Sequence, residues 1–538
     1  MNFKKIKQLV MTDLLQTNRQ MNNSGKKIES KNIVFRLLLQ NGVILVTFSV
    51  LYGALLGNTP FTEYPGVFSN MLSTILLFSS LQFFQFIFTL FFEDEDLSTY
   101  LALPFTVKEI FTSKVFSLIL SSFSYFVFPI LLFLILGRQA GLSILLSTIF
   151  ALINSLLIFS VLILSIFVIL HVLNQFALFR KHKRIFTIGI YVVLTVSVFY
   201  LIFKQSYSND AALGLGATDQ KANALFVGFY EIFIAGLRVA GLWKVGLWGL
   251  LFVFLLWFTN EKIIPQLFMN EEASSPKKEK DTKKKEIEFG YAHSPTQNFL
   301  NYQLRQLQDT SFIMQLLFSK FYLPFVMIAP FLFGGDDFGD LTKINQMKSL
   351  WGLFILVGLI LSYVLTDSSS ISGTIISLDQ ENYYYIQSMP FSFKKYLRAK
   401  FYFAFFVEWL LGSLAILFVL LFMKLSIFFA IATLLGFTFG TYLVSTHYFK
   451  RDYDKLYLNW SNFADLTKRG VSQAVRIFVI MAFIMIFSVG LVFLFIFFTT
   501  YLSATARVVF SIVMTLVMPL IAYIYYRISE NSFWRRFE

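Results

Sequence analysis

The chain has 538 residues, of which 57% are hydrophobic and 14% charged, and it contains 68 phenylalanines. Because a soluble chain carries about a quarter charged residues, this composition excludes an ordinary soluble domain and indicates an all-α, polytopic membrane protein. The absence of cysteine excludes disulfides and thiolate metal sites, and the net charge of +14 is better explained by basic loops facing an anionic leaflet than by binding to nucleic acid.

Twelve apolar stretches approach the length of about 20 residues that a membrane-spanning helix needs. The first half of the chain holds six of them, at 34–57, 68–92, 114–137, 143–172, 185–204 and 240–259. The second half holds the other six, at 318–335, 349–366, 400–422, 423–447, 475–499 and 506–527. A tight turn near 423–426 must separate two of these spans. The sequence therefore predicts about 12 transmembrane helices in two six-helix repeats, over residues 34–260 and 318–527.

Each predicted repeat follows an amphipathic lead-in segment. The first lead-in, at 1–33, has four apolar residues on one face at helical spacing, which is typical of a helix lying in the membrane surface: Phe3, Ile6, Val10 and Leu14. The second lead-in, at 297–317, has the same pattern at Leu300, Leu304 and Leu307.

Charged segments predict which parts of the chain lie on the cytoplasmic side of the membrane. The stretch at 261–296 is highly charged and predicts a flexible cytoplasmic linker, and 528–538 is predicted to be a cytoplasmic tail. Lysine and arginine cluster on one side of the twelve-span map, at 4–7, 26–31, 179–184, 277–285 and 450–455. Because such clusters favour the cytoplasmic side, both termini are predicted to lie in the cytoplasm.

A polar loop with a central proline occurs twice. The first copy, "EDLSTYLALPFTVKEIFTSK", covers 95–114, and the second, "ENYYYIQSMPFSFKKYLRAK", covers 381–400. Aligning the two prolines also aligns Lys114 with Lys400. Both copies are predicted in the cytoplasm between the second and third spans of their repeats.

The loop is predicted to form a short helix, then a sharp turn at the proline, and then the start of the next helix. Apolar residues at helical spacing precede Pro104, which breaks the helix. Thr106 and Glu109 fit a capping box that begins the following helix. Ser392 can cap the second copy, but Lys395 stands where a box needs an acidic residue. One copy alone favours a well-capped loop without a partner, whereas two equivalent copies favour a paired docking function.

This pattern resembles the permease subunits of type-2 ATP-binding-cassette exporters. Acidic residues, then a Leu-Pro-Phe sequence, then a lysine at the start of the third span carry the resemblance, over about 25 residues in each half. The family has six-span units with an amphipathic lead-in helix, and the chain resembles two such units fused, as in large permeases of Gram-positive bacteria. The resemblance implies a multi-pass protein of a bacterial plasma membrane. The outer loops are too short for a large extracellular domain, which fits a small amphiphile, such as a hydrophobic peptide or a lipid-like compound, as substrate.

In that family the loop between the second and third spans holds a coupling helix that docks on the ATPase. Carried over by position, the docking residues of the first copy would be Glu95, Leu97, Tyr100, Leu103, Pro104 and Phe105. Those of the second copy would be Glu381, Tyr383, Ile386, Met389, Pro390 and Phe391. Lys114 and Lys400 would anchor the next helix at the cytoplasmic interface. The family also places a re-entrant element before the last span, which 223–239 could form, whereas 499–506 is too short to match it.

The chain carries no phosphate-binding GxxxxGK[ST] loop. The sequence therefore predicts a transport subunit that is not an enzyme and has no cofactor of its own, with ATP bound by two copies of a soluble partner ATPase. Glu408 is a charge about two turns into a predicted span, so it is a candidate for the translocation path. A hydrogen bond between helices, to Ser, Tyr or Trp, explains it equally well.

Two other classes of protein remain as alternatives. A secondary transporter built from parallel repeats should show broken helices in matching positions of both halves, and the sequence shows almost none. A membrane-embedded transferase or hydrolase should show clustered His, Asp or Glu at one membrane face. The chain has four histidines, at 171, 182, 293 and 447, and no pair has a ligand spacing.

Overall fold

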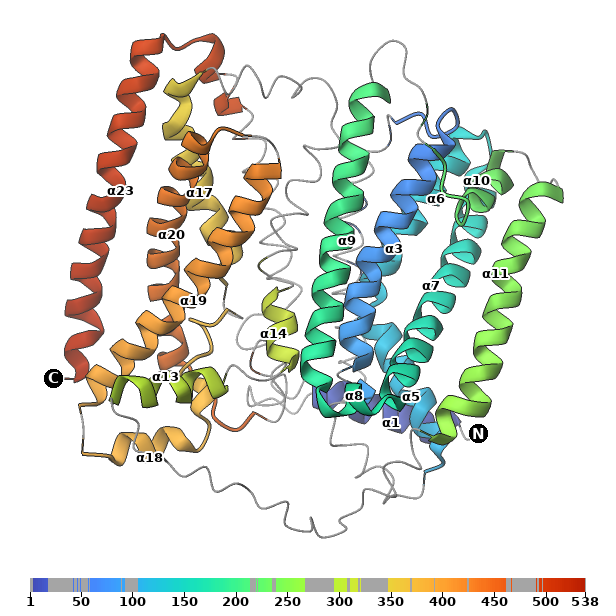
Figure 1. Ribbon diagram of the computed structural model, residues 1–538, viewed down its shortest axis with the longest axis horizontal. Coiled ribbons are helices and arrows are strands. Elements are labelled where there is room, and N and C mark those ends of the chain that lie inside the picture. Colours follow the sequence, from blue (N-terminus) through green and yellow to red (C-terminus); the bar gives the residue numbers. More distant parts are fainter. Residues whose placement is uncertain are drawn as a thin grey trace. The chain divides into compact units, whose positions relative to one another are not determined.

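The computed structural model of the chain describes residues 3–17, 59–91, 105–212, 219–234, 239–266, 295–317, 347–460 and 493–537, with short gaps inside some of these ranges and a few single residues outside them. The chain divides into two compact units, Met1–Asn298 and Phe299–Glu538, which are described here one at a time (Figure 1). Every regular element in the described residues is a helix. Seven of these helices are long and apolar enough to cross a membrane: Pro65–Phe88, Ile144–Gln175, Gly241–Gln266, Lys348–Leu365, Phe393–Leu420, Ile427–Asp454 and Ala504–Phe537.

The first unit is built from long helices that run side by side, with short helices at their ends (Figure 1). The long helices are α3 (Pro65–Phe88), α7 (Ile144–Gln175), α9 (Lys183–Ala212) and α11 (Val239–Phe258). The shorter ones are α1 (Phe3–Thr17), α5 (Val107–Ser121), α6 (Val127–Gln139), α8 (Ala177–Lys181) and α10 (Val227–Ile234). Helix α1 packs on α5 and lies across the end of the bundle.

The second unit has the same kind of arrangement. Its long helices are α17 (Trp351–Leu365), α19 (Phe393–Phe422), α20 (Ile427–Asp454) and α23 (Ala504–Ser532). Two short helices, α13 (Pro295–Gln306) and α18 (Asn382–Ser388), lie across the end of this bundle at which α19 begins (Figure 1). A further short helix is α14 (Thr310–Leu317), and the chain ends in a 3₁₀ turn, η9 (Trp534–Phe537).

Most of the predicted spans that fall on described residues coincide with helices. Seven match the candidate spans given above, and 185–204 matches α9, whose apolar part is Ile185–Leu201. The predicted turn near 423–426 is confirmed, because α19 ends at Phe422 and Ser426 caps α20. The predicted spans 34–57, 318–335 and 475–499 lie mostly or wholly outside the described residues.

The predicted span 114–137 is wrong as one continuous helix. Helix α5 ends at Ser121, a 3₁₀ turn follows at Phe123–Phe126, and α6 begins at Val127. The physical reason is Pro129, which lacks an N–H and would clash with the carbonyl group four residues earlier in an unbroken helix. In α6 this proline falls in the first turn, where it does no harm.

Both lead-in segments form helices, with different faces toward their units. In α1, Ile6 and Leu9 are buried and Lys7 is exposed. In α13 the polar side faces the unit instead: Gln303 is buried, while Leu300 and Leu304 are 45% and 52% exposed. A helix lying in the membrane surface needs its leucines on an outer, lipid-facing side, and α13 has them there. Phe3, Leu14 and Leu307 lie outside the described side chains.

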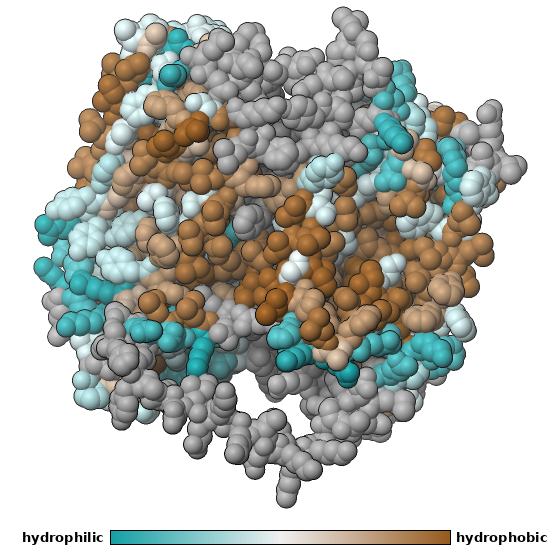
Figure 2. Space-filling view, in the orientation of Figure 1, coloured by the Kyte–Doolittle hydropathy of each residue, from teal (hydrophilic) through white to brown (hydrophobic). Residues whose placement is uncertain are grey.

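The outer surfaces of the described spans are strongly apolar. Figure 2 shows apolar side chains over much of the described surface on the side in view. Exposed large apolar residues run along the last described span of each unit, among them Leu250 and Phe254 of α11 and Leu516 and Ile521 of α23. Because lipid tails do not penalise such exposure, these faces suit a membrane environment.

Glycine allows α17 and α20 to pack closely. A side-chain Cβ at Gly436 would overlap the carbonyl oxygen of Ile355, and one at Gly358 would overlap that of Thr433. Small residues are the usual means by which membrane helices approach each other at this distance. These two helices carry residues of the site described below, so their spacing sets its dimensions.

We expect Gly436→Ala to destabilise the second unit by about 1–3 kcal/mol, because the added methyl group forces the two helices apart. Thermal unfolding in detergent measures the loss. Gly249→Ala is the matched control, since nothing lies within 4 Å of the Cβ position at that helical glycine. Equal unfolding temperatures for both variants would contradict the close packing of α17 and α20.

Candidate functional site

The second copy of the repeated loop is largely described, and it forms helix α18. Its buried side is Tyr383, which is 4% exposed, and its outer side carries Tyr384 and Tyr385, at 66% and 65%. Among the other predicted docking residues, Glu381 and Pro390 are exposed and Ile386 and Met389 are half-buried. Phe391 lies outside the described residues.

Of the first copy only the end is described. Phe105 is half-buried, and the ammonium group of Lys5 in α1 lies 5.9 Å from the centre of its ring. The other predicted docking residues lie outside the described part of the chain: Glu95, Leu97, Tyr100, Leu103 and Pro104. The lead-in helix of this unit therefore contacts the end of its own repeated loop.

The predicted capping box at the start of α5 is confirmed. The Glu109 N–H donates to Thr106 Oγ1 at 3.3 Å, and the Thr106 N–H donates to Glu109 Oε2 at 3.1 Å. At the start of α19, the Lys395 N–H donates to Ser392 Oγ at 3.4 Å, without a reciprocal acidic partner. Helix α5 thus begins at Val107 and α19 at Phe393, each directly after a capping Thr or Ser.

Lys114 and Lys400 make the same contact in their two units. Each is buried, and each ammonium group donates to a main-chain carbonyl oxygen on the chain that leads out of the second span. Lys114 Nζ reaches Leu90 at 2.9 Å, and Lys400 Nζ reaches Ile375 at 2.8 Å. The two lysines therefore tie the start of the third span to the chain before the loop, from inside the protein and not from an exposed interface. We call this contact the lysine joint.

The second span of the second unit is interrupted. Helix α17 ends at Leu365, and the chain then continues through the bundle as bends, turns and a 3₁₀ turn at Ser377–Asp379. All residues from 370 to 379 are buried. Gln380, with a φ of 49°, then reverses the chain into α18. We call residues 366–380 the interrupted segment; its run of Ser, Thr and Gly at 366–374 was the sequence signal that could have indicated it.

Buried carboxylates hold the main chain of the interrupted segment. Glu408 of α19 accepts from the Ser372 N–H at 2.6 Å and from the Ser445 hydroxyl at 3.1 Å. One oxygen thus binds the main chain of the interrupted segment and the other binds a serine of α20, which is the hydrogen bond between helices that one of the two interpretations expected. Non-helical main chain at membrane depth needs such internal partners.

Asp452 is a buried residue of this site that the sequence did not reveal. Its carboxylate accepts from the Ile376 N–H at 2.8 Å and from the Ser377 hydroxyl at 2.6 Å, and it is 2% exposed. In the sequence it lies inside "KRDYDK" at 450–455, a cluster of three basic and two acidic residues that was predicted to lie in the cytoplasm. The tertiary fold alone places the Asp452 side chain in the interior of the unit.

Lys320 is a second such residue. It is fully buried, and its ammonium group donates to the Leu365 carbonyl oxygen at 2.6 Å, at the C-terminal end of α17. That carbonyl group has lost its helical partner because the helix stops there. A cation at a helix C-terminus also matches the direction of the helix dipole.

Asp379 joins the lead-in helix to the loop. Its carboxylate pairs with Lys400 at 2.7 Å and accepts from Tyr302 and Gln306 of α13 at 2.9 Å and 2.7 Å. Tyr396 of α19 donates to it at 3.1 Å. Burial, together with the charge of Asp379, raises the pKa of the Tyr302 hydroxyl, so this group keeps its proton and remains a donor. The first residue after this cluster, Gln380, leads directly to α18.

The two units differ in their interior polarity. Aligned through the two prolines, Lys400 has a lysine counterpart, but Glu408 corresponds to Ser122 and Asp452 to Ile166. Helix α3 of the first unit is also continuous to Phe88 where the second unit is interrupted. The lysine joint is thus shared by both halves, whereas the buried carboxylates belong to the second.

The short helix α10 lies within the predicted re-entrant stretch 223–239 and packs against α11. Glu231 pairs with Lys244 of α11 at 2.5 Å. Arg238, at the end of the same stretch, lies outside the described residues.

No family model, no curated protein and no solved structure matches this chain.

We expect Lys400→Met to destabilise the protein by about 3–5 kcal/mol, because Asp379 would stay buried without its counter-charge. Adding Asp379→Asn should recover part of the loss, since both charges are then absent. Thermal unfolding in detergent measures both variants, with Lys395→Met as the exposed control on the same helix. A double variant no more stable than Lys400→Met would contradict the pairing.

Proposed function

We propose that the chain is the membrane subunit of an ATP-driven exporter, on which two copies of a separate ATPase dock at the two repeated loops. The observation that carries the proposal is the lysine joint, which recurs at matching positions of the two halves. A loop that only connects two spans needs no buried charge. A loop that transmits force needs a rigid connection to both of its spans, and a buried, hydrogen-bonded lysine provides one.

The shape of α18 supports docking in the second half. Tyr384 and Tyr385 present two exposed aromatic rings at the end of the unit, while Tyr383 packs beneath them. Tyrosine is enriched where proteins bind each other, because it buries a large area with few rotatable bonds. A partner bound there would press on a helix that Asp379 connects to both α13 and α19.

The proposed substrate is a small amphiphile, a hydrophobic peptide or a lipid-like compound, moved out of a bacterial plasma membrane. The apolar outer faces of the spans would let such a compound reach the protein from the bilayer. In this proposal both termini lie on the ATPase side, because α13, α18 and the basic segments belong to that face.

The proposal predicts that a soluble ATPase co-purifies with the tagged protein from native membranes, near two copies per chain, because each half offers one docking loop. Mass spectrometry identifies it. Replacing Leu103, Pro104, Phe105, Met389, Pro390 and Phe391 by Ala should release it. A control variant with Tyr501→Ala, an exposed aromatic residue shortly before the start of α23, should keep it.

A stable native protein that translocates an NBD-labelled phospholipid in vesicles without ATP, and that brings down no ATPase, would contradict the exporter proposal. Loss of the ATPase from both the loop variant and the Tyr501→Ala control would point to general misfolding, which gel filtration of each variant excludes or identifies.

A secondary transporter remains the second candidate, because such proteins use non-helical chain around their binding sites and the second unit has buried, non-helical chain in the interrupted segment. Four buried hydroxyl groups on or beside it have no hydrogen-bond partner within the described part of the chain: Thr366, Ser370, Ser372 and Thr441. Such groups require a water or a ligand. They surround the segment that Glu408 holds.

For this candidate, an imposed pH gradient without ATP should drive translocation of the NBD-labelled phospholipid, and Glu408→Gln should reduce it at least tenfold. Glu381→Gln, an exposed change in the same unit, should leave it unaltered. A translocation rate that depends on ATP and ignores the gradient would exclude the secondary transporter.

A further inference from the structure

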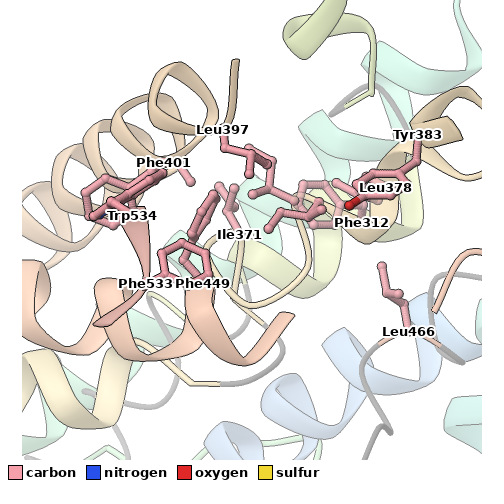
Figure 3. Packing of buried hydrophobic residues seen from close by; sticks show 13 residues of the cluster. Phe312, Ile371, Leu378, Tyr383, Leu397, Phe401, Phe449, Leu466, Phe533 and Trp534 are labelled. Carbon is pink, nitrogen blue, oxygen red and sulfur yellow. The ribbon is translucent and has the colours of Figure 1, made fainter. Parts of the chain in front are cut away.

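The C-terminal end of the chain is packed into the second unit and is no loose tail. Helix α23 continues to Ser532, and η9 then folds back under the bundle. Phe533 and Trp534 are 1% and 6% exposed. Both belong to one apolar cluster with Leu378 and Tyr383 from the loop side of the unit (Figure 3).

Aromatic contacts connect this end to α18 in two steps. The ring of Tyr383 in α18 lies 5.7 Å from that of Phe393, at the start of α19. The same Phe393 ring lies 6.1 Å from Phe537, which also contacts Tyr453 of α20 at 5.0 Å. Ring pairs at these distances are attractive contacts and not chance neighbours.

Charged contacts fasten the end of α23 to the same turn of α19. Glu530 pairs with Arg398, and its carboxylate lies 3.7 Å from Lys394. The Arg398 guanidinium group also lies 5.5 Å from the Trp534 ring. The first turns of α19 are therefore held on one side by α18 and on the other by the end of α23. We call residues 530–537 the C-terminal clamp.

The rest of α23 packs on α17 and α20 along one side. There the Ser511 hydroxyl accepts from the Gly352 N–H and donates to the Ser349 carbonyl oxygen, both at 2.9 Å, while the opposite, apolar side of the helix is exposed. Because packed interiors transmit strain, a displacement at the clamped end would be carried along the helix to these contacts.

We propose that the C-terminal clamp positions α23 for transport: it passes a displacement of α18 through Phe393 and Phe537 to the last span. The inference rests on the proposed function, since the displacement would come from a docked ATPase. Phe537 and Glu530 are in this sense positioning residues, which act through α19.

The test uses the absence of native cysteine. Spin labels on Ile431→Cys of α20 and Ile512→Cys of α23, both exposed, report the distance between the two helices by pulsed electron resonance. The complex with its co-purified ATPase is measured without nucleotide and then with ATP and vanadate. In the labelled protein with no further change we expect the main distance to shift. With Phe537→Ala the ATPase should stay bound and hydrolyse ATP, but the shift should be lost.

Conservative and control variants separate positioning from folding. Phe537→Tyr keeps the ring and should restore the shift, and Phe406→Ala, an exposed change on α19, should leave it intact. If Phe537→Ala fails to fold, Glu530→Gln loosens the other half of the clamp and should at least halve the shifted population.

A full shift in folded Phe537→Ala and Glu530→Gln complexes would overturn the clamp while leaving the exporter proposal standing. A native protein that binds no ATPase would overturn both. The two failures are thus distinguishable.

Discussion

One constraint shapes the second unit: main-chain polar groups that are buried in an apolar interior must find hydrogen-bond partners. Once α17 stops at Leu365, turns such as Ile375 N–H to Ile371 O and Leu378 N–H to Thr374 O satisfy only part of the following main chain, and lipid offers no partners to the rest. Lys320, Lys400, Glu408 and Asp452 supply the missing partners, each by a charged group directed at backbone atoms of the interrupted segment or of the helix end before it. Removing one charge would leave both an unpaired backbone group and an uncompensated opposite charge nearby.

This arrangement makes the interrupted segment a mechanical link. Glu408 of α19 holds it at Ser372, and Asp379 lies near its end, shortly before α18. The C-terminal clamp grips the same first turns of α19 from the other side. The end of the unit is therefore a compact joint on which the lead-in helix, the loop helix and the last span all converge. Of the four charged residues that partner the backbone, the aligned sequence of the first unit has a counterpart only to Lys400, so the interiors of the two halves differ.

Local rules predicted much of the fold. The capping box at Thr106 and Glu109 and the turn before α20 depend only on residues close in sequence, and both are confirmed. Spans were predictable because about 20 apolar residues suffice to mark one. The break between α5 and α6 was predictable in principle from Pro129, but an unbroken apolar run concealed it. Asp452 was not predictable, because a single inward-facing acid inside a charged cluster resembles any solvated charge.

By itself, the sequence determined that the chain is helical, that it is suited to a membrane, and that it carries one loop twice. These properties follow from composition, apolar length and local chemistry, which need no knowledge of distant residues. The tertiary structure alone decided that the chain after α17 stays buried as turns, that Glu408 and Asp452 accept hydrogen bonds from its backbone, and that the end of the chain packs on α19. Those outcomes depend on contacts between residues 30 to 160 positions apart, and only the complete packing places such partners within hydrogen-bonding distance.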